Sequence, residues 1–91
     1  MDSTQIINIL KNSGNMTEVA EIKWFKGYRM NKKDNNEEIT VKIFDMGSGS
    51  QSRYSCIAES DQDKQDKKKS VGNPDPNLEG AIENIHWWDF D

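Results

Sequence analysis

The sequence predicts a small α+β fold, in which a C-terminal helix packs on an antiparallel sheet of three or four strands and a short helix comes first. Three observations predict it. Residues 37–45 and 53–60 alternate apolar and polar side chains, which is typical of half-buried strands. Residues 76–85 space their apolar side chains three or four positions apart, as a helix on a sheet does. Ninety-one residues suffice for one domain, so residues 1–91 are expected to fold as a single unit.

The first element expected is a short helix over residues 3–12. Ile6, Ile7 and Leu10 fall on one side of it and would form its buried face. The small and polar residues 13–15 then favour its end. So short a helix needs support from the rest of the fold.

Residues 17–29 fit two structures, a strand or a helix. As a strand, they place Ile22, Trp24 and Tyr28 on one face; as a helix, they line up a different apolar set. Gly27 and the neighbouring aromatic residues favour the strand, and the sequence leaves the helix open. We expect Trp24 to lie in the core.

The clearest pairing is an antiparallel hairpin of residues 38–45 with residues 53–60, joined through the glycine- and serine-rich segment 46–52. The first strand has a β-branched, apolar face, which comprises Ile39, Val41 and Ile43. The second strand has one face made of Tyr54, Cys56 and Ala58. Cys56 is therefore expected to be a buried structural thiol.

Residues 61–70 are entirely polar and predict a flexible surface loop. Residues 68–72 are expected to add a short edge strand. The last element is the C-terminal helix, with Asp75 as its cap and Pro76 in its first turn. Its apolar stripe comprises Leu78, Ala81, Ile82 and Ile85.

Composition and charge exclude several classes of protein. The net charge is −4, which argues against a protein that coats DNA or RNA. One cysteine excludes an internal disulfide and favours a reducing compartment, and no apolar run is long enough to span a membrane. With no secretion signal at the N-terminus, we expect a cytoplasmic protein without membrane association.

The residues that carry catalytic or metal chemistry are few. His86 is the only histidine, and zinc sites usually need three or four ligands rich in His and Cys. Cys56 would need a nearby base and an electropositive setting to act as a nucleophile, and it is expected mid-strand on the core face. We therefore expect no enzyme, no metal site and no cofactor.

The C-terminal segment combines aromatic rings with acidic groups, as many protein interfaces do. One of Trp87 and Trp88 is expected to complete the core, and the other to be exposed together with Phe90. The sequence does not decide which. The predicted interaction residues are Glu83, Trp87, Trp88, Asp89, Phe90 and Asp91. They suggest a small non-enzymatic interaction module (an adaptor, inhibitor or immunity-type protein) that binds a protein partner and is itself a monomer or weak homodimer.

Two other functions stay open. One is nucleic-acid binding through the basic residues of 23–33 and 64–69, because single-strand binders interleave bases and aromatic rings. The contacts in the first range would be Lys23, Lys26, Arg29, Lys32 and Lys33. The other is a role as accessory subunit of a larger enzyme complex.

Overall fold

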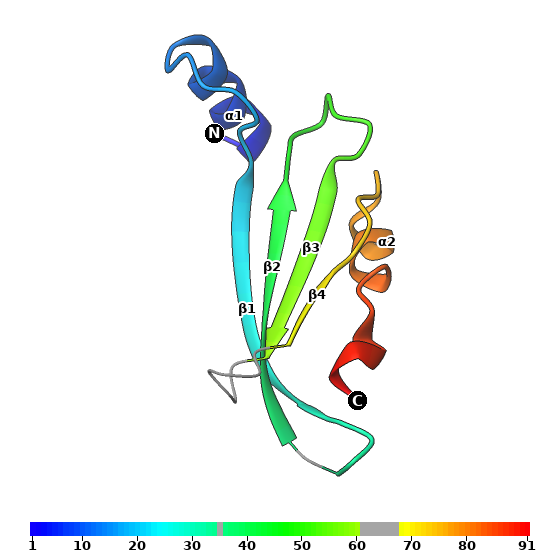
Figure 1. The fold of residues 1–91 in the computed structure, drawn as a ribbon. Coiled ribbons are helices and arrows are strands. Elements are labelled where there is room, and N and C mark those ends of the chain that lie inside the picture. Colours follow the sequence, from blue (N-terminus) through cyan, green and yellow to red (C-terminus); the bar gives the residue numbers. More distant parts are fainter. Residues whose placement is uncertain (35, 61–67) are drawn as a thin grey trace.

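The computed structural model describes residues 1–34, 36–60 and 68–91, and confirms the predicted α+β fold. Helix α1 (Ser3–Asn12) comes first, and the chain ends in helix α2 (Leu78–Glu83) and a 3-10 helix, η1 (Trp87–Phe90). Between them lie the strands β1 (Glu21–Met30), β2 (Asn36–Asp45), β3 (Tyr54–Ser60) and β4 (Lys69–Val71) (Figure 1). The ambiguous segment 17–29 is thus a strand from Glu21 onward.

The four strands form one antiparallel sheet in the order β1-β2-β3-β4, so each strand pairs with its neighbour in sequence. The expected pairing of β2 with β3 is confirmed, with Val41 opposite Ala58. Strand β1 pairs with β2 over its whole length, from Glu21 opposite Asp45 to Met30 opposite Asn36, without a bulge. Because directly opposed residues point to the same side, the sheet has two distinct faces.

The core lies on one face, hereafter the covered face, where α2 and η1 pack on the sheet. The buried apolar cluster comprises Ile39, Cys56, Ala58, Ala81, Ile85 and Phe90. Cys56 is completely buried, as expected, and this burial raises the pKa of its thiol. The opposite side, hereafter the open face, carries no helix from the part of the chain that the structure describes, and it contains Trp24, Lys42 and Ile57 in one row across β1, β2 and β3.

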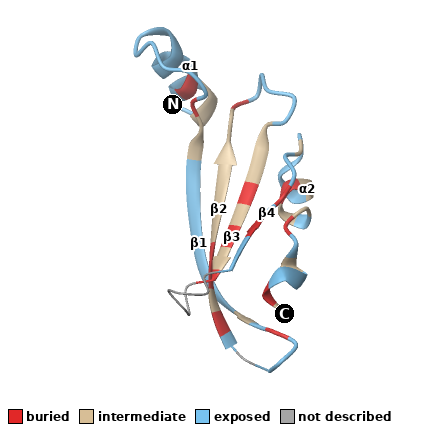
Figure 2. Ribbon diagram, viewed as in Figure 1, coloured by how far each residue is buried: buried red, intermediate tan, exposed pale blue. Residues whose placement is uncertain are grey.

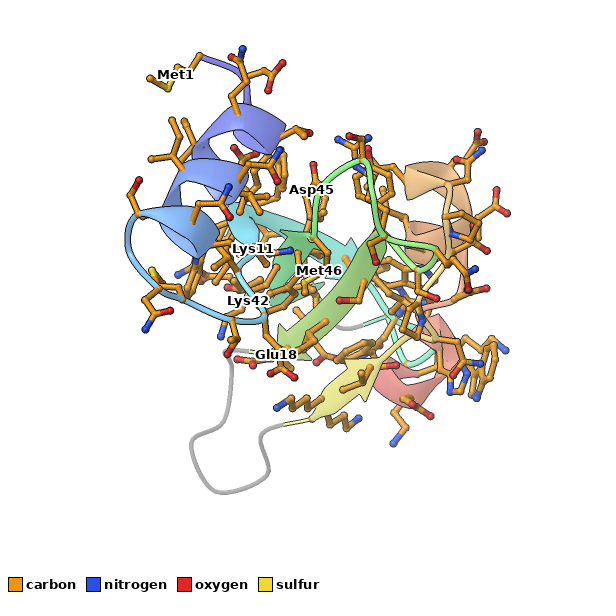
Figure 3. The ribbon with its side chains drawn as sticks, turned by 90° about the horizontal axis from the view of Figure 1, so that it is seen from above. Met1, Lys11, Glu18, Lys42, Asp45 and Met46 are labelled. Carbon is orange, nitrogen blue, oxygen red and sulfur yellow. The ribbon has the colours of Figure 1, made fainter. Side chains whose placement is uncertain are left out.

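Helix α1 lies beyond the end of β1 and not over the sheet (Figure 1). Seen from above, it stands well apart from α2 (Figure 3). Asp2 caps it through a hydrogen bond from the backbone N–H of Gln5 at 2.8 Å, and Ser3 donates a hydrogen bond to Glu21 of β1. Only Ile7 of the expected apolar face is buried, whereas Ile6 and Leu10 are exposed.

The C-terminal helix is shorter than the sequence suggests, because the chain leaves the helical path before the tryptophans. Asn77 caps α2 by accepting from the backbone N–H of Glu79 at 3.0 Å, in place of the expected Asp75. After Glu83, the backbone N–H of His86 donates to Ser70 Oγ of β4 at 3.0 Å. That bond draws the chain toward the sheet edge, and the tryptophans begin η1.

Lys69–Val71 form the short edge strand expected near 68–72. The predicted flexible loop at 61–70 falls mainly on residues 61–67, which lie outside the described residues. In the described part of the chain, no helix is long and apolar enough to cross a membrane.

Candidate interaction surface

Strand β1 is an edge strand whose large apolar side chains are exposed on both faces of the sheet. Figure 2 shows most of it in the colour of exposed residues. Trp24, Phe25 and Tyr28 have exposed fractions of 63%, 55% and 71%. With Ile22 and Met30, also exposed, these residues are called the β1 surface below. Small domains seldom expose so many large apolar groups together unless they bind something.

On the open face, the β1 surface lies among ion pairs. Lys42 Nζ stands 4.5 Å from the ring centre of Trp24, a distance at which the cation and the ring attract each other. The same ammonium group is 3.5 Å from Glu59 Oε1, and Lys26 Nζ is 3.0 Å from Glu38 Oε1. The lysines of the open face therefore meet carboxylates beside the aromatic rings.

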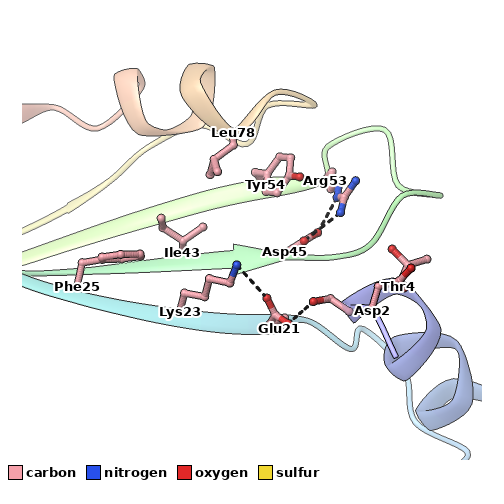
Figure 4. Close-up of a pocket in the computed structure, with 11 residues that line it drawn as sticks. Asp2, Thr4, Glu21, Lys23, Phe25, Ile43, Asp45, Arg53, Tyr54 and Leu78 are labelled. Atoms are coloured by element: carbon pink, nitrogen blue, oxygen red, sulfur yellow. Dashed lines mark hydrogen bonds and ion pairs between the residues drawn. The ribbon is translucent and has the colours of Figure 1, made fainter.

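On the covered face, Phe25 lines two clefts. The larger has a volume of about 430 Å³ and lies between the start of α1 and Leu78 of α2 (Figure 4). Its charged groups bind one another: Lys23 Nζ is 3.5 Å from Glu21 Oε1, and Arg53 holds Asp45 through contacts of 2.7 and 3.1 Å.

The chemistry of this larger cleft is that of paired charges. The hydrogen bond from Arg53 lowers the pKa of the Asp45 carboxyl, and the N–H of Gly47 adds a second hydrogen bond at 2.9 Å. Asp45 is therefore an ionised structural group near neutral pH. No group of three His, Cys, Asp or Glu among the described residues is placed to hold a metal ion.

The smaller cleft, of about 270 Å³, joins β1 to the C-terminal segment. Phe25 and Tyr28 line it from β1, Val41 lines it from β2, and Trp87 lines it from η1. Arg29 Nη1 donates a hydrogen bond to Asp91 Oδ1 at 2.7 Å, and this hydrogen bond lowers the pKa of the Asp91 carboxyl. The end of the chain and the edge strand thus form one continuous surface.

The structure separates the predicted C-terminal interaction residues into buried and exposed ones. Trp87 is half-buried against the core, and Trp88 is exposed and stacks on the His86 ring with centroids 4.6 Å apart. Glu83 and Asp89 are exposed. Phe90 was expected to be exposed with one tryptophan; this is wrong, because its ring is completely buried under η1.

The predicted basic contacts are divided between the two faces. Lys23 and Arg29 lie on the covered face and Lys26 lies on the open face, and each is bound to a carboxylate. Lys32 and Lys33 are exposed in the turn between β1 and β2, and Lys68 and Lys69 are exposed at the start of β4. Residues 64–67 of the second predicted range lie outside the described residues.

The exposure of Trp24 corrects the expectation that it belongs to the core. An α-helix is about 10 Å across and strands lie about 4.8 Å apart, so one helix covers roughly two strands. Helix α2 packs over β3 on the covered face, which leaves Phe25 of β1 outside its reach. Trp24 lies on the open face, where no helix of the described residues packs. The sequence carried one signal of this: β1 has aromatic residues at positions of both parities, and a six-residue helix cannot bury them all.

Comparisons with known protein families, with curated proteins and with solved structures give no match to this chain.

Proposed function

We propose that this chain is a small non-enzymatic protein-interaction module that binds its partner through the β1 surface. The observation that carries the proposal is the exposure of Trp24, Phe25 and Tyr28 on one edge strand. Aromatic residues are enriched among the anchors of protein interfaces, because a large rigid ring buries much area at little entropic cost. An adaptor, an inhibitor and an immunity-type protein all fit this description, and a cytoplasmic location is part of the proposal.

A protein partner is favoured over nucleic acid because of the charges around the rings. Lys26 and Lys42, the lysines next to Trp24 on the open face, already meet Glu38 and Glu59. Binding to phosphates gains its free energy by neutralising them with Lys and Arg, and nearby carboxylates oppose this. The net charge of −4 acts in the same direction.

The C-terminal segment supports the same surface from its side. Trp87 lines the smaller cleft together with Phe25 and Tyr28, so a partner seated on β1 would also touch η1. Trp88 and Asp89 of the predicted acidic and aromatic surface are exposed on η1, and neither lines this cleft.

The test is affinity capture of the tagged protein from its own cells. It compares the amount of partner recovered by variants that keep the wild-type fold. The double substitution Trp24→Ala with Tyr28→Ala is expected to reduce recovery of the partner roughly 30-fold, as the loss of an interface anchor does. The thermal midpoint should change little, because both rings lie mostly in solvent. Trp88→Ala is the matched control, since it also removes an exposed aromatic ring.

Three results would assign the function differently. Full partner recovery with the double variant would refute the β1 surface as the binding site. Loss of the partner with Trp88→Ala alone would make η1 the anchor. A salt-dependent mobility shift of a single-stranded oligonucleotide, abolished by Trp24→Ala, would assign β1 to nucleic acid instead.

A further inference from the structure

The outer edge of β1 is long and regular. In residues 1–34, 36–60 and 68–91, β1 has a strand partner on one side only, which is β2. Its ten residues contain no proline, and its ladder with β2 has no bulge. Natural sheets usually protect such an edge with proline, a bulge, a short strand or charged side chains, because it can pair with another chain. Strand β1 has only the last of these, and its cations Lys23, Lys26 and Arg29 each meet a carboxylate. Strand β4, the other outer strand, is protected in this way, since it has only three residues.

The direction of the backbone groups shows which residues face that edge. Tyr54 exchanges both backbone hydrogen bonds with Asp75, at 3.0 and 2.9 Å, so its N–H and C=O point away from β2. Asp45 lies opposite Tyr54 in the antiparallel ladder, so the backbone N–H and C=O of Asp45 point toward β1, where Asp45 pairs with Glu21. Alternation along β1 turns the backbone of Ile22, Trp24 and Tyr28 outward. Trp24 and Tyr28, the exposed aromatic residues of the open face, are therefore among the residues whose backbone N–H and C=O groups point toward the outer edge.

We propose that two copies of this chain associate by pairing β1 with β1 in antiparallel orientation about a twofold axis at Phe25. The inference rests on the proposed function of β1 as a binding surface and names one partner, a second copy of the chain. A twofold axis perpendicular to the sheet keeps open face next to open face, so directly opposed residues share a side. The resulting pairs are Phe25 with Phe25, Trp24 with Lys26, Ile22 with Tyr28, and Glu21 with Arg29.

Charge selects this register over its neighbours. Glu21 is the only acidic residue of β1, and the axis at Phe25 sets it opposite Arg29, with no cation opposite another. An axis at Lys26 would set Lys26 against itself and Lys23 against Arg29, and like charges directly opposed are unfavourable. An axis at Trp24 would set Ile22 against a lysine and carry Arg29 beyond the partner strand.

The remaining positions fit the same register. Lys26 of one copy comes opposite Trp24 of the other. It adds a second cation to the Trp24 ring, on the side away from Lys42. Lys23 comes opposite Gly27, beside which nothing lies within 4 Å of where a Cβ atom would stand. The space left by this glycine admits the lysine stem without displacing a neighbour.

The size of the contact predicts a weak dimer. An aromatic side chain offers about 150–250 Å², so the exposed fractions of Trp24, Phe25 and Tyr28 leave roughly 300–450 Å² of ring surface per copy. If all of this surface were buried, with Ile22, Met30 and the strand backbone added, two copies together would only approach the low end of specific interfaces, about 1,200 Å². Such interfaces dissociate on dilution.

Sedimentation equilibrium between roughly 10 µM and 1 mM tests the dimer. The wild-type chain is expected to rise from 10.5 kDa toward twice that mass as its concentration increases. Phe25→Lys and Phe25→Glu each place like charges at the twofold axis, so each variant alone should dissociate at least tenfold more readily. An equimolar mixture of the two should recover the dimer, because opposite charges then meet at the axis.

Matched controls keep the outcome interpretable. Trp88→Ala should dimerise as the wild type does. Tyr28→Pro removes an outward N–H and leaves the β1–β2 ladder intact, so it should stay folded by circular dichroism and remain monomeric. The proposal is overturned if the wild type stays at 10.5 kDa throughout, or if the mixed variants fail to associate.

The two proposals fail separately. A monomeric wild type whose partner capture depends on Trp24 would refute the dimer and leave the proposed function standing. A dimer that forms through β1, combined with partner capture that is indifferent to Trp24 and Tyr28, would do the reverse.

Discussion

Glu37 is an almost completely buried carboxylate, next to the turn that joins β1 to β2. Its side chain accepts hydrogen bonds from Asn31 Nδ2 and Ser60 Oγ, both at 2.8 Å. These partners come from the β1–β2 turn and from the end of β3, so one side chain joins three segments. The hydrogen bond from Asn31 is the main cause that lowers the pKa of Glu37.

Removing this carboxylate should cost more than neutralising it. Glu37→Ala removes the acceptor of two buried hydrogen bonds, and we expect a loss of about 1–3 kcal/mol in the free energy of unfolding. Glu37→Gln keeps one carbonyl oxygen in place and should cost less. Urea unfolding of both variants measures the two free energies of unfolding. An equal loss for Glu37→Ala and Glu37→Gln would show that the hydrogen bond accepted by the remaining carbonyl oxygen does not stabilise the fold.

The elements differ in how far their sequences determine them. Strands β2 and β3 were predictable because Ile39, Val41 and Ile43 alternate strictly and a glycine-rich connection follows. Strand β1 was predictable as a strand, but the exposure of Trp24 depends on where α2 lies, and periodicity carries no information about that. The break between α2 and η1 depends on a hydrogen bond to Ser70 of β4, which lies 16 residues before His86 in the sequence.

Element η1 packs on the core through Phe90, which is buried, and Trp87, which is half-buried. Phe90 is the largest fully buried side chain among the described residues, and it lies in the cluster formed with Ile39 and Ile85. Phe90→Ala should lower the free energy of unfolding by about 3–5 kcal/mol, since it removes a core ring and leaves a cavity. Trp88→Ala, two residues earlier, should change it by less than about 0.5 kcal/mol. A chemical denaturation curve for each variant measures the contrast, and similar losses would contradict the burial pattern.

At the scale of the whole molecule, three carboxylates among the described residues stabilise the fold by joining different segments, with first partners 6, 8 and 62 positions away in the sequence. Glu37, Asp45 and Asp91 have pKa values below the ordinary range, each lowered first by a side-chain hydrogen bond. A carboxyl group whose pKa is lower in the folded state stabilises that state fully above its unfolded pKa, near about 4. This stability is lost as the pH falls through the lowered folded value.

The thermal midpoint should therefore be level near neutral pH and fall steadily below about pH 5. Melting curves by circular dichroism between about pH 7 and pH 2 measure this. Asp45→Asn, which keeps the shape of the side chain, should flatten part of the decline. A midpoint that rises on acidification would contradict the assignment of these ion pairs and hydrogen bonds.

The sheet order β1-β2-β3-β4 has a consequence for how the chain finds its structure. Each strand pairs with the next along the sequence, so the strands assemble by closing successive hairpins, which are fast steps. The contact between Arg29 and Asp91 spans 62 residues, and it forms only when the C-terminal segment docks. Folding is thus expected to begin with the meander and to end when Phe90 seals the covered face, with the rate set by that late docking step.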